Sequence, residues 1–107
     1  MNTGIIYIIK CKDPKIEQCY IGSTTNLKNR IKNHKKSLKD KTKNKNKLYT
    51  FIKKNNGFDN FFFEILQDEI QFNHRNELRI IERFHIEDIG IELTLNTEIP
   101  SRTVKEY

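Results

Sequence analysis

Apolar and polar residues alternate in short blocks at the start of the chain, and these blocks predict two strands. The β-branched and aromatic run Ile5–Ile9 is typical of a strand. The segment Gln18–Gly22 predicts a second strand, which returns from a turn at Asp13-Pro14-Lys15. The pair therefore predicts an antiparallel hairpin. Cys11 and Cys19 are expected at its open loop end as free thiols that could face each other.

The pattern after the hairpin predicts mainly helices. Ser23, Thr24 and Thr25 offer caps for the first of them. The order of elements, β-β-α-α-β-α with one possible further strand, predicts an α+β fold: a small three-stranded, mainly antiparallel sheet flanked by helices. The predicted elements are a helix over 26–39, a short helix from Leu48 that closes around 55–57, a strand over 60–66, a helix over 73–89 ended by Gly90, and a short strand over 92–96.

The last predicted helix carries a carboxylate on its apolar face. At about 100° per residue, Glu82 lies inside the stripe formed by Leu78, Ile81 and Ile86. A carboxylate on a buried face costs several kcal/mol unless it is paired or coordinates a cation. The ordinary alternative is a glutamate at the helix edge whose charged head reaches water or an arginine. His85, on the same face, is expected to be a satisfied core histidine.

The first predicted helix carries two basic side chains beside its apolar stripe. Arg30 and His34 are four residues apart on one face and border Leu27 and Ile31. An arginine that faces the core edge suits bidentate capture of a phosphate. A salt bridge, for example with Glu82, is the ordinary alternative.

Two tyrosines lie on adjacent strands of the predicted hairpin. Tyr7 is on the opposite face from Ile6 and Ile8, and Tyr20 shares a face of its strand with Gly22. Such tyrosines are ordinarily core residues with a hydroxyl at the edge. Together with the cationic helix face and the inward carboxylate, they nevertheless form a candidate site.

The positive charge of the chain is local. The net charge is +6, and ten of the 20 Lys and Arg residues lie between Lys28 and Lys47, where Asp40 is the single acid. The rest of the chain is slightly acidic. Such a patch is typical of phosphate contact, although a solvated lysine-rich face is the alternative. The lysines expected to contact DNA are Lys28, Lys32, Lys35, Lys36, Lys43, Lys45 and Lys47.

Length and composition exclude several classes of protein. A chain of 107 residues predicts one domain. No apolar run approaches a membrane span, and the N-terminus lacks the pattern of a secretory signal. Two cysteines are too few for a disulfide scaffold or a four-cysteine zinc site. We therefore expect an intracellular protein of the cytoplasm or nucleus, neither secreted nor in a membrane.

One ordered set of residues resembles a known nuclease family. Tyr20-Ile21-Gly22 is followed by Arg30 and His34, and this order resembles the GIY-YIG nuclease family over nearly the whole chain. At the first motif, Ile5-Ile6-Tyr7 keeps the tyrosine, but Ile5 stands where a glycine is usual and Gly4 comes one place earlier. The other matching segments are Leu48-Tyr49, Gly57–Phe61, Glu64–Leu66, Glu82 followed by Ile86, and Leu95-Asn96.

The resemblance implies a DNA endonuclease domain with a GIY-YIG-like fold over residues 1–97 and a tail over 98–107. Glu82 would ligate one Mg²⁺ or Mn²⁺, with water and a phosphate oxygen in the other positions. The metal would stabilise the leaving 3′ oxygen, and Arg30 would bind the same phosphate.

The resemblance also implies which residues activate the attacking water. Tyr7, helped by Tyr20 or His34, would orient and deprotonate this water. A free tyrosine has a pKa of about 10, so the metal or a neighbouring cation such as Arg30 must acidify it. Asn96 would orient the metal-binding carboxylate or a backbone group.

Two other functions remain open at this point. The first is a catalytically impaired DNA-binding module of the same fold, in which Ile5 shifts Tyr7. The second is a lysine-rich interaction domain without a nucleic-acid role. Cleavage of plasmid DNA with a divalent ion separates the nuclease from the binding module, and affinity for duplex DNA at ~50 mM salt separates both from the interaction domain.

Overall fold

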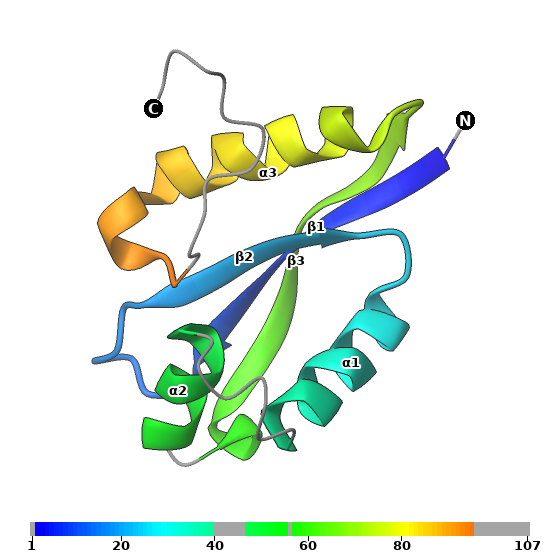
Figure 1. Ribbon diagram of the computed structural model, residues 1–107. Coiled ribbons are helices and arrows are strands. Elements are labelled where there is room, and N and C mark those ends of the chain that lie inside the picture. Colours follow the sequence, from blue (N-terminus) through cyan, green and yellow to red (C-terminus); the bar gives the residue numbers. More distant parts are fainter. Residues whose placement is uncertain (1, 40–46, 56, 96–107) are drawn as a thin grey trace.

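A three-stranded antiparallel sheet forms the centre of the fold, and helices cover both of its faces (Figure 1). The computed structural model describes residues 2–39, 47–55 and 57–95. β1 lies between β2 and β3, so that β2 is an edge strand. The predicted α+β fold is confirmed. Its elements are β1 (Asn2–Cys11), β2 (Cys19–Thr24), α1 (Leu27–Lys39), α2 (Lys47–Lys54), the 3₁₀ turn η2 (Phe58–Asn60), β3 (Phe61–Phe72), α3 (Arg75–Ile89) and the 3₁₀ turn η3 (Ile91–Leu93).

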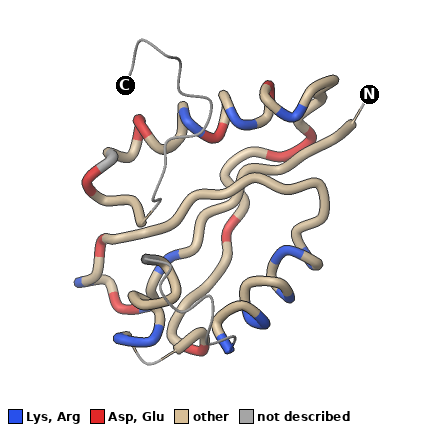
Figure 2. The backbone as a smooth tube through the Cα atoms, viewed as in Figure 1, with Lys and Arg blue, Asp and Glu red and all other residues tan. Residues whose placement is uncertain are grey.

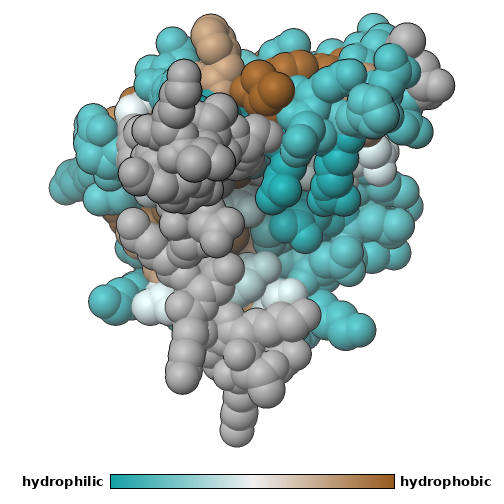
Figure 3. Space-filling model, turned by 45° about the horizontal axis from the view of Figure 1, so that its top comes forward, coloured by the Kyte–Doolittle hydropathy of each residue, from teal (hydrophilic) through white to brown (hydrophobic). Residues whose placement is uncertain are grey.

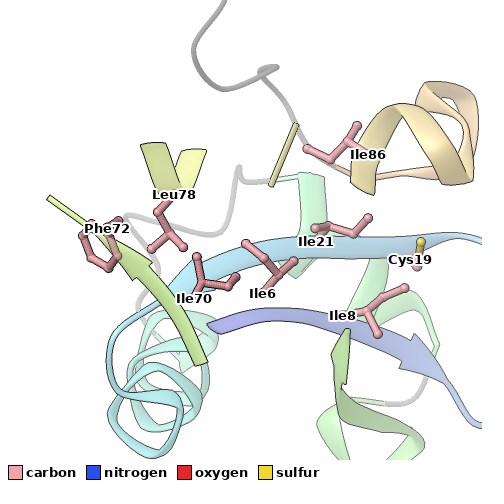
Figure 4. Close-up of a cluster of buried hydrophobic side chains, with 8 residues drawn as sticks. All are labelled: Ile6, Ile8, Cys19, Ile21, Ile70, Phe72, Leu78 and Ile86. Atoms are coloured by element: carbon pink, nitrogen blue, oxygen red, sulfur yellow. The ribbon is translucent and has the colours of Figure 1, made fainter. Parts of the chain in front are cut away.

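α3 packs across one face of the sheet. Leu78 and Ile86 lie over apolar side chains of the strands beneath the helix (Figure 4). Full burial of one such side chain stabilises the fold by roughly 1.5–3 kcal/mol, so these contacts hold α3 against the sheet. The buried cluster consists of Ile6, Ile8, Cys19, Ile21, Ile70, Phe72, Leu78 and Ile86.

The opposite face of the sheet packs against α2 through a second cluster. Cys19 pairs with Lys10, and side chains of successive strand residues point to opposite faces. Cys11 therefore belongs to this cluster, whereas Cys19 belongs to the first. Both cysteines are buried and free, but the prediction that they face each other is wrong. The second cluster consists of Tyr7, Ile9, Cys11, Leu48, Tyr49, Ile52, Phe61 and Leu95.

The three helices begin and end close to the predicted residues. The side chain of Asn26 caps α1, because its Oδ1 accepts a hydrogen bond from the Asn29 amide; the predicted caps Ser23, Thr24 and Thr25 do not have this role. After α2, Gly57 has a φ of 85°, and its amide donates to the Ile52 carbonyl. Over the described residues, no helix has the length and apolar character that crossing a bilayer requires.

β3 continues well beyond the strand predicted over residues 60–66. It runs to Phe72, and its register against β1 shifts on either side of Ile6. Glu69, with a φ of 53°, lies just before the last residues of the strand. This irregularity turns Ile70 and Phe72 into the core. The polar run before Ile70 breaks the period-two alternation, so the sequence pattern did not reveal the second half of β3.

The short strand predicted over residues 92–96 is not formed in the described part of the chain. η3 follows Gly90, and Thr94 forms an isolated parallel bridge to Cys19. The Leu95 amide donates to the Cys19 carbonyl over 2.7 Å. The first residues of the predicted strand belong to the 3₁₀ turn η3, so the described residues after it form an isolated bridge rather than a strand. The predicted tail over 98–107 lies outside the described residues, so the domain boundary stays a prediction.

Candidate active site

Tyr7 and Gly22 face each other across β1 and β2. They are partners in the antiparallel register, and the tyrosine is fully buried. A Cβ atom added to Gly22 would collide with the ring and the hydroxyl of Tyr7. The position therefore requires a glycine, because the tyrosine ring lies directly against its backbone.

The Tyr7 hydroxyl contacts two side chains of α1. It lies 2.8 Å from Nε2 of His34 and accepts a hydrogen bond of 3.2 Å from Nε of Arg30. Residues four apart project from the same side of a helix, so one face of α1 brings both groups to Tyr7. The salt bridge considered for Arg30 and Glu82 is not formed, since Arg83–Glu87 is the ion pair found among the described residues.

His34 is buried between two tyrosines. Its Nδ1 lies 3.0 Å from the Tyr49 hydroxyl on α2, and only 1% of the residue is exposed. Burial and the nearby charge of Arg30 lower the pKa of His34 to about 4, so the imidazole is neutral at pH 7. We assign the proton of the neutral His34 to Nδ1: the Tyr7 hydroxyl, which accepts from Arg30, then donates its own proton to Nε2, and Nδ1–H donates to Tyr49. These four residues form the tyrosine–histidine network.

Both candidate tyrosines are protonated in this environment. Burial raises the pKa of Tyr7 well above its ordinary value, and Arg30 lowers this pKa by a smaller amount. Burial also raises the pKa of Tyr20, again against an opposing effect of Arg30. The direction predicted for Arg30 is right, but its charge alone does not convert either tyrosine into a base at neutral pH.

Glu82 lies on the inward face of α3, as its position in the helical pattern predicted. It is 8% exposed. Burial raises the pKa of this carboxyl, although a hydrogen bond from Ser23 and the charges of nearby arginines act in the opposite direction. The carboxylate is therefore partly desolvated and incompletely compensated, which favours binding of a cation.

A cavity of about 510 Å³ lies at the edge of the sheet and is lined by Tyr20, Arg30 and Glu82 among others. Its polar walls come from the end of β2, from α1 and from the first half of α3. Tyr20 lines the cavity, whereas Tyr7 and His34 are buried and are not among its lining residues. Figure 3, which is turned so that the α3 side comes forward, shows a mainly hydrophilic surface with few apolar areas. The cavity is lined by Asn2, Tyr20, Gly22, Ser23, Thr24, Thr25, Arg30, Phe72, Arg75, Leu78, Arg79 and Glu82.

The donor set of the cavity fits a hard divalent cation held by one carboxylate. Within the described ranges, no group of three or more His, Cys, Asp and Glu residues could hold a metal ion. This composition does not suit a structural zinc site. Mg²⁺ usually keeps several waters and takes one or two carboxylates together with phosphate oxygens. Glu82, which faces a cavity lined by hydroxyl groups, matches that requirement.

The predicted DNA-binding lysines are distributed over α1 and the residues that follow it. Figure 2 shows several blue segments along α1, and the predicted lysines of this helix are exposed. Lys47 is the first residue of α2. The predicted lysines of α1 are Lys28, Lys32, Lys35 and Lys36; Lys39, at the end of the helix, is exposed as well. The predicted residues that lie outside the described part of the chain are Lys43, Lys45 and Asn96.

His85 lies away from the cavity. Its Nε2 is 2.9 Å from Oε1 of Gln67 on β3, so it is a half-buried and partnered histidine rather than a site residue. Sequence reasoning missed three residues that do belong to the site. Tyr49 lies in a segment that resembles the family, but the sequence assigns it no role because it looks like an ordinary core position. Arg75 and Arg79 could have been found from the helical spacing 75, 79, 82, which places them on the face of Glu82.

Comparison with known families settles the classification. The family model of the GIY-YIG catalytic domain matches residues 3–86. The chain belongs to the GIY-YIG family. No curated protein and no solved structure gives a significant match to the chain. Membership of this nuclease family, with DNA as the implied substrate, agrees with the basic helix and the polar cavity.

The unusual first motif of this GIY-YIG domain leaves Tyr7 in contact with its partners. Ile5 is half-buried and pairs with Thr24, and the register continues without a break to Tyr7 and Gly22. Gly4 packs against α3 instead, where an added Cβ would lie 2.9 Å from both terminal methyl groups of Leu78. The absence of a side chain at Gly4 thus allows β1 to pack closely against α3.

Proposed function

We propose that this GIY-YIG domain hydrolyses phosphodiester bonds of DNA in a reaction that depends on Mg²⁺ or Mn²⁺. The observation that supports this most is the buried, incompletely compensated carboxylate of Glu82, which shares one cavity with Arg30 and Tyr20. The exposed lysines of α1 would hold the DNA backbone through phosphate contacts that carry no sequence information.

In this proposal Glu82 ligates the metal and Arg30 binds the phosphate that is attacked. The bound metal ion supplies charge stabilisation at the leaving 3′ oxygen. The Arg30 guanidinium is directed by its hydrogen bond to Tyr7, so it needs little reorganisation as charge develops on the phosphate. The products would carry a 5′ phosphate and a 3′ hydroxyl.

The proton of the attacking water would pass to the tyrosine–histidine network or to Tyr20. With its proton assigned to Nδ1, His34 would accept the proton of the Tyr7 hydroxyl at Nε2, which lies 2.8 Å away. Tyr20 is the candidate base that lines the cavity itself. Its ring centroid lies 6.4 Å from that of Tyr7, so both hydroxyls belong to one cluster around Arg30.

Nicking of supercoiled plasmid tests the proposal. We expect nicking with Mg²⁺, loss of nicking in EDTA, and loss in Glu82→Gln. Asp88→Asn is the matched control, because it removes an exposed acid from the same helix outside the cavity. Retention of plasmid without nicking would instead favour the DNA-binding module, which the replacement of the first-motif glycine by Ile5 suggests. Equal nicking by Glu82→Gln and wild type would contradict the role of Glu82.

A further inference from the structure

Two arginines of α3 line the cavity beside Glu82 without a function in the mechanism above. Arg75 and Arg79 are one helical turn apart, and Glu82 follows one turn later on the same face. Both arginines are exposed, whereas the carboxylate is buried. We refer to these three residues as the α3 wall of the cavity.

Neither arginine of the α3 wall is engaged in an ion pair with another described residue. The ion pair of this helix is formed by Arg83 with Glu87, over 2.8 Å and outside the cavity. The charges of Arg75 and Arg79 lower the pKa of Glu82, but burial has the larger effect. Their guanidinium groups are therefore available to an anion, and the planar guanidinium binds phosphate oxygens in a bidentate manner.

The charge balance of the cavity also favours an anion with several charges. Arg30 stands on one side, the two arginines of the α3 wall on the other, and Glu82 is the acid among the lining residues. Arg75 and Arg79 are separated by about 6 Å along the helix axis. A DNA strand carries one phosphate for roughly every 3.4 Å of duplex length. Two arginines at this separation can therefore contact the phosphates next to the one that Arg30 binds.

We propose that Arg75 and Arg79 form a second phosphate-binding site, which holds backbone phosphates next to the one bound by Arg30. The proposal rests on the function proposed above, and it extends the DNA contact from the lysines of α1 to the opposite side of the cavity. The ligand is the phosphodiester backbone of DNA, bound independently of base sequence. Arg75 and Arg79 would thus act in substrate binding, while Arg30 acts on the reacting phosphate.

Affinity for duplex DNA as a function of salt tests this site without relying on cleavage. The variants are Arg75→Gln, Arg79→Gln and the double variant, measured by fluorescence anisotropy in EDTA. We expect each substitution to reduce the slope of log K against log salt by about one unit, and the double variant by about two. Arg83→Gln is the control, because it removes an arginine of the same helix that does not line the cavity.

The outcomes separate this inference from the proposed nuclease activity. Unchanged slopes in the double variant, or an equal reduction in Arg83→Gln, would overturn the second phosphate site even if the wild type nicks plasmid. Reduced slopes confined to Arg75→Gln and Arg79→Gln would support the site even if no preparation nicks DNA. Arg79→Lys should keep the salt slope of the wild type but bind more weakly, since an ammonium group keeps the charge and loses the bidentate contact.

Discussion

On the α1 side of the cavity, Arg30 and His34 are both hydrogen-bonded to Tyr7. On the α3 side, Arg75 and Arg79 make no ion pair with any described residue. The first side is fixed by hydrogen bonds between buried groups, so its geometry exists before a substrate arrives. The second side presents charge on exposed side chains. Under the proposed function, orientation of the reacting phosphate and attraction of the DNA backbone would therefore fall to different layers of the fold.

The largest effect should follow from removal of the guanidinium on the α1 side. Arg30→Ala is expected to lower kcat by about 10²–10³-fold, because a directed cation at the developing charge is lost. Its effect on DNA affinity should be much smaller, in contrast to Arg79→Gln. Steady-state nicking kinetics together with anisotropy measure both quantities. Equal losses in turnover and in binding would contradict a role in the transition state.

Acid should weaken the α1 side through His34. The pKa of His34 is about 4 in the folded protein and about 6.5 in an unfolded chain. The unfolded state therefore takes up a proton first as the pH falls. The contribution of the neutral His34 to the free energy of unfolding is fully present above pH 6.5. It decreases by about 3 kcal/mol on acidification to pH 4. Urea unfolding between pH 7 and 4 measures the decrease, and His34→Gln should show a flatter pH dependence. The same dependence in both proteins would refute the contribution of His34.

A single methyl group added at Gly22 should disrupt the packing of β2 against β1. Gly22→Ala is expected to cost about 1–3 kcal/mol, because the new Cβ collides with the ring of Tyr7 and a well-packed core must shift. Thermal unfolding should show a decrease in Tm of roughly 10 °C.

Two further variants sharpen this test. In a Tyr7→Ala background the same Gly22→Ala substitution should cost little, because the colliding ring is gone; an undiminished cost would show that the collision is not the cause. Gly4→Ala is the counterpart on the α3 side, where the added Cβ meets the mobile ends of Leu78. Its cost should be smaller and independent of Tyr7.

The smallest effect is expected from Tyr49→Phe. This change removes the acceptor for Nδ1–H of His34, so the stability loss should be about 1 kcal/mol, close to the contribution of one hydrogen bond. Nitrogen NMR of the imidazole reports the tautomer directly. We expect the wild type to carry its proton on Nδ1 and the variant to populate the Nε2-protonated form more. An identical tautomer distribution would contradict the proposed direction of these hydrogen bonds.

Sequence patterns predicted the residues of the site whose signal is local. Glu82 was found because a helical period places it among apolar residues, and Arg30 and His34 because they lie one turn apart beside such a stripe. Tyr49 could not be found in this way. Its value to the site depends on how α2 packs against α1, which is a long-range contact that periodicity does not encode.

The fold was predictable where apolar and polar residues alternate regularly along a strand, and less so where this alternation is interrupted. The second half of β3 was hidden by the irregularity before Ile70, since a shift in register changes which residues face the core. Of the last strand expected over 92–96, the described residues up to 95 form η3 and an isolated bridge at Thr94, because the turn after Gly90 determines the path of the chain there.

β2 is one of the two edge strands of the sheet, and the cavity lies where this strand ends. A protein of this size cannot enclose a DNA polymer and has to bind it at one place along its length. Because the proposed site lies at the edge of the sheet, a long DNA strand would pass along it from the side, and its entry would require no opening of the hydrophobic core.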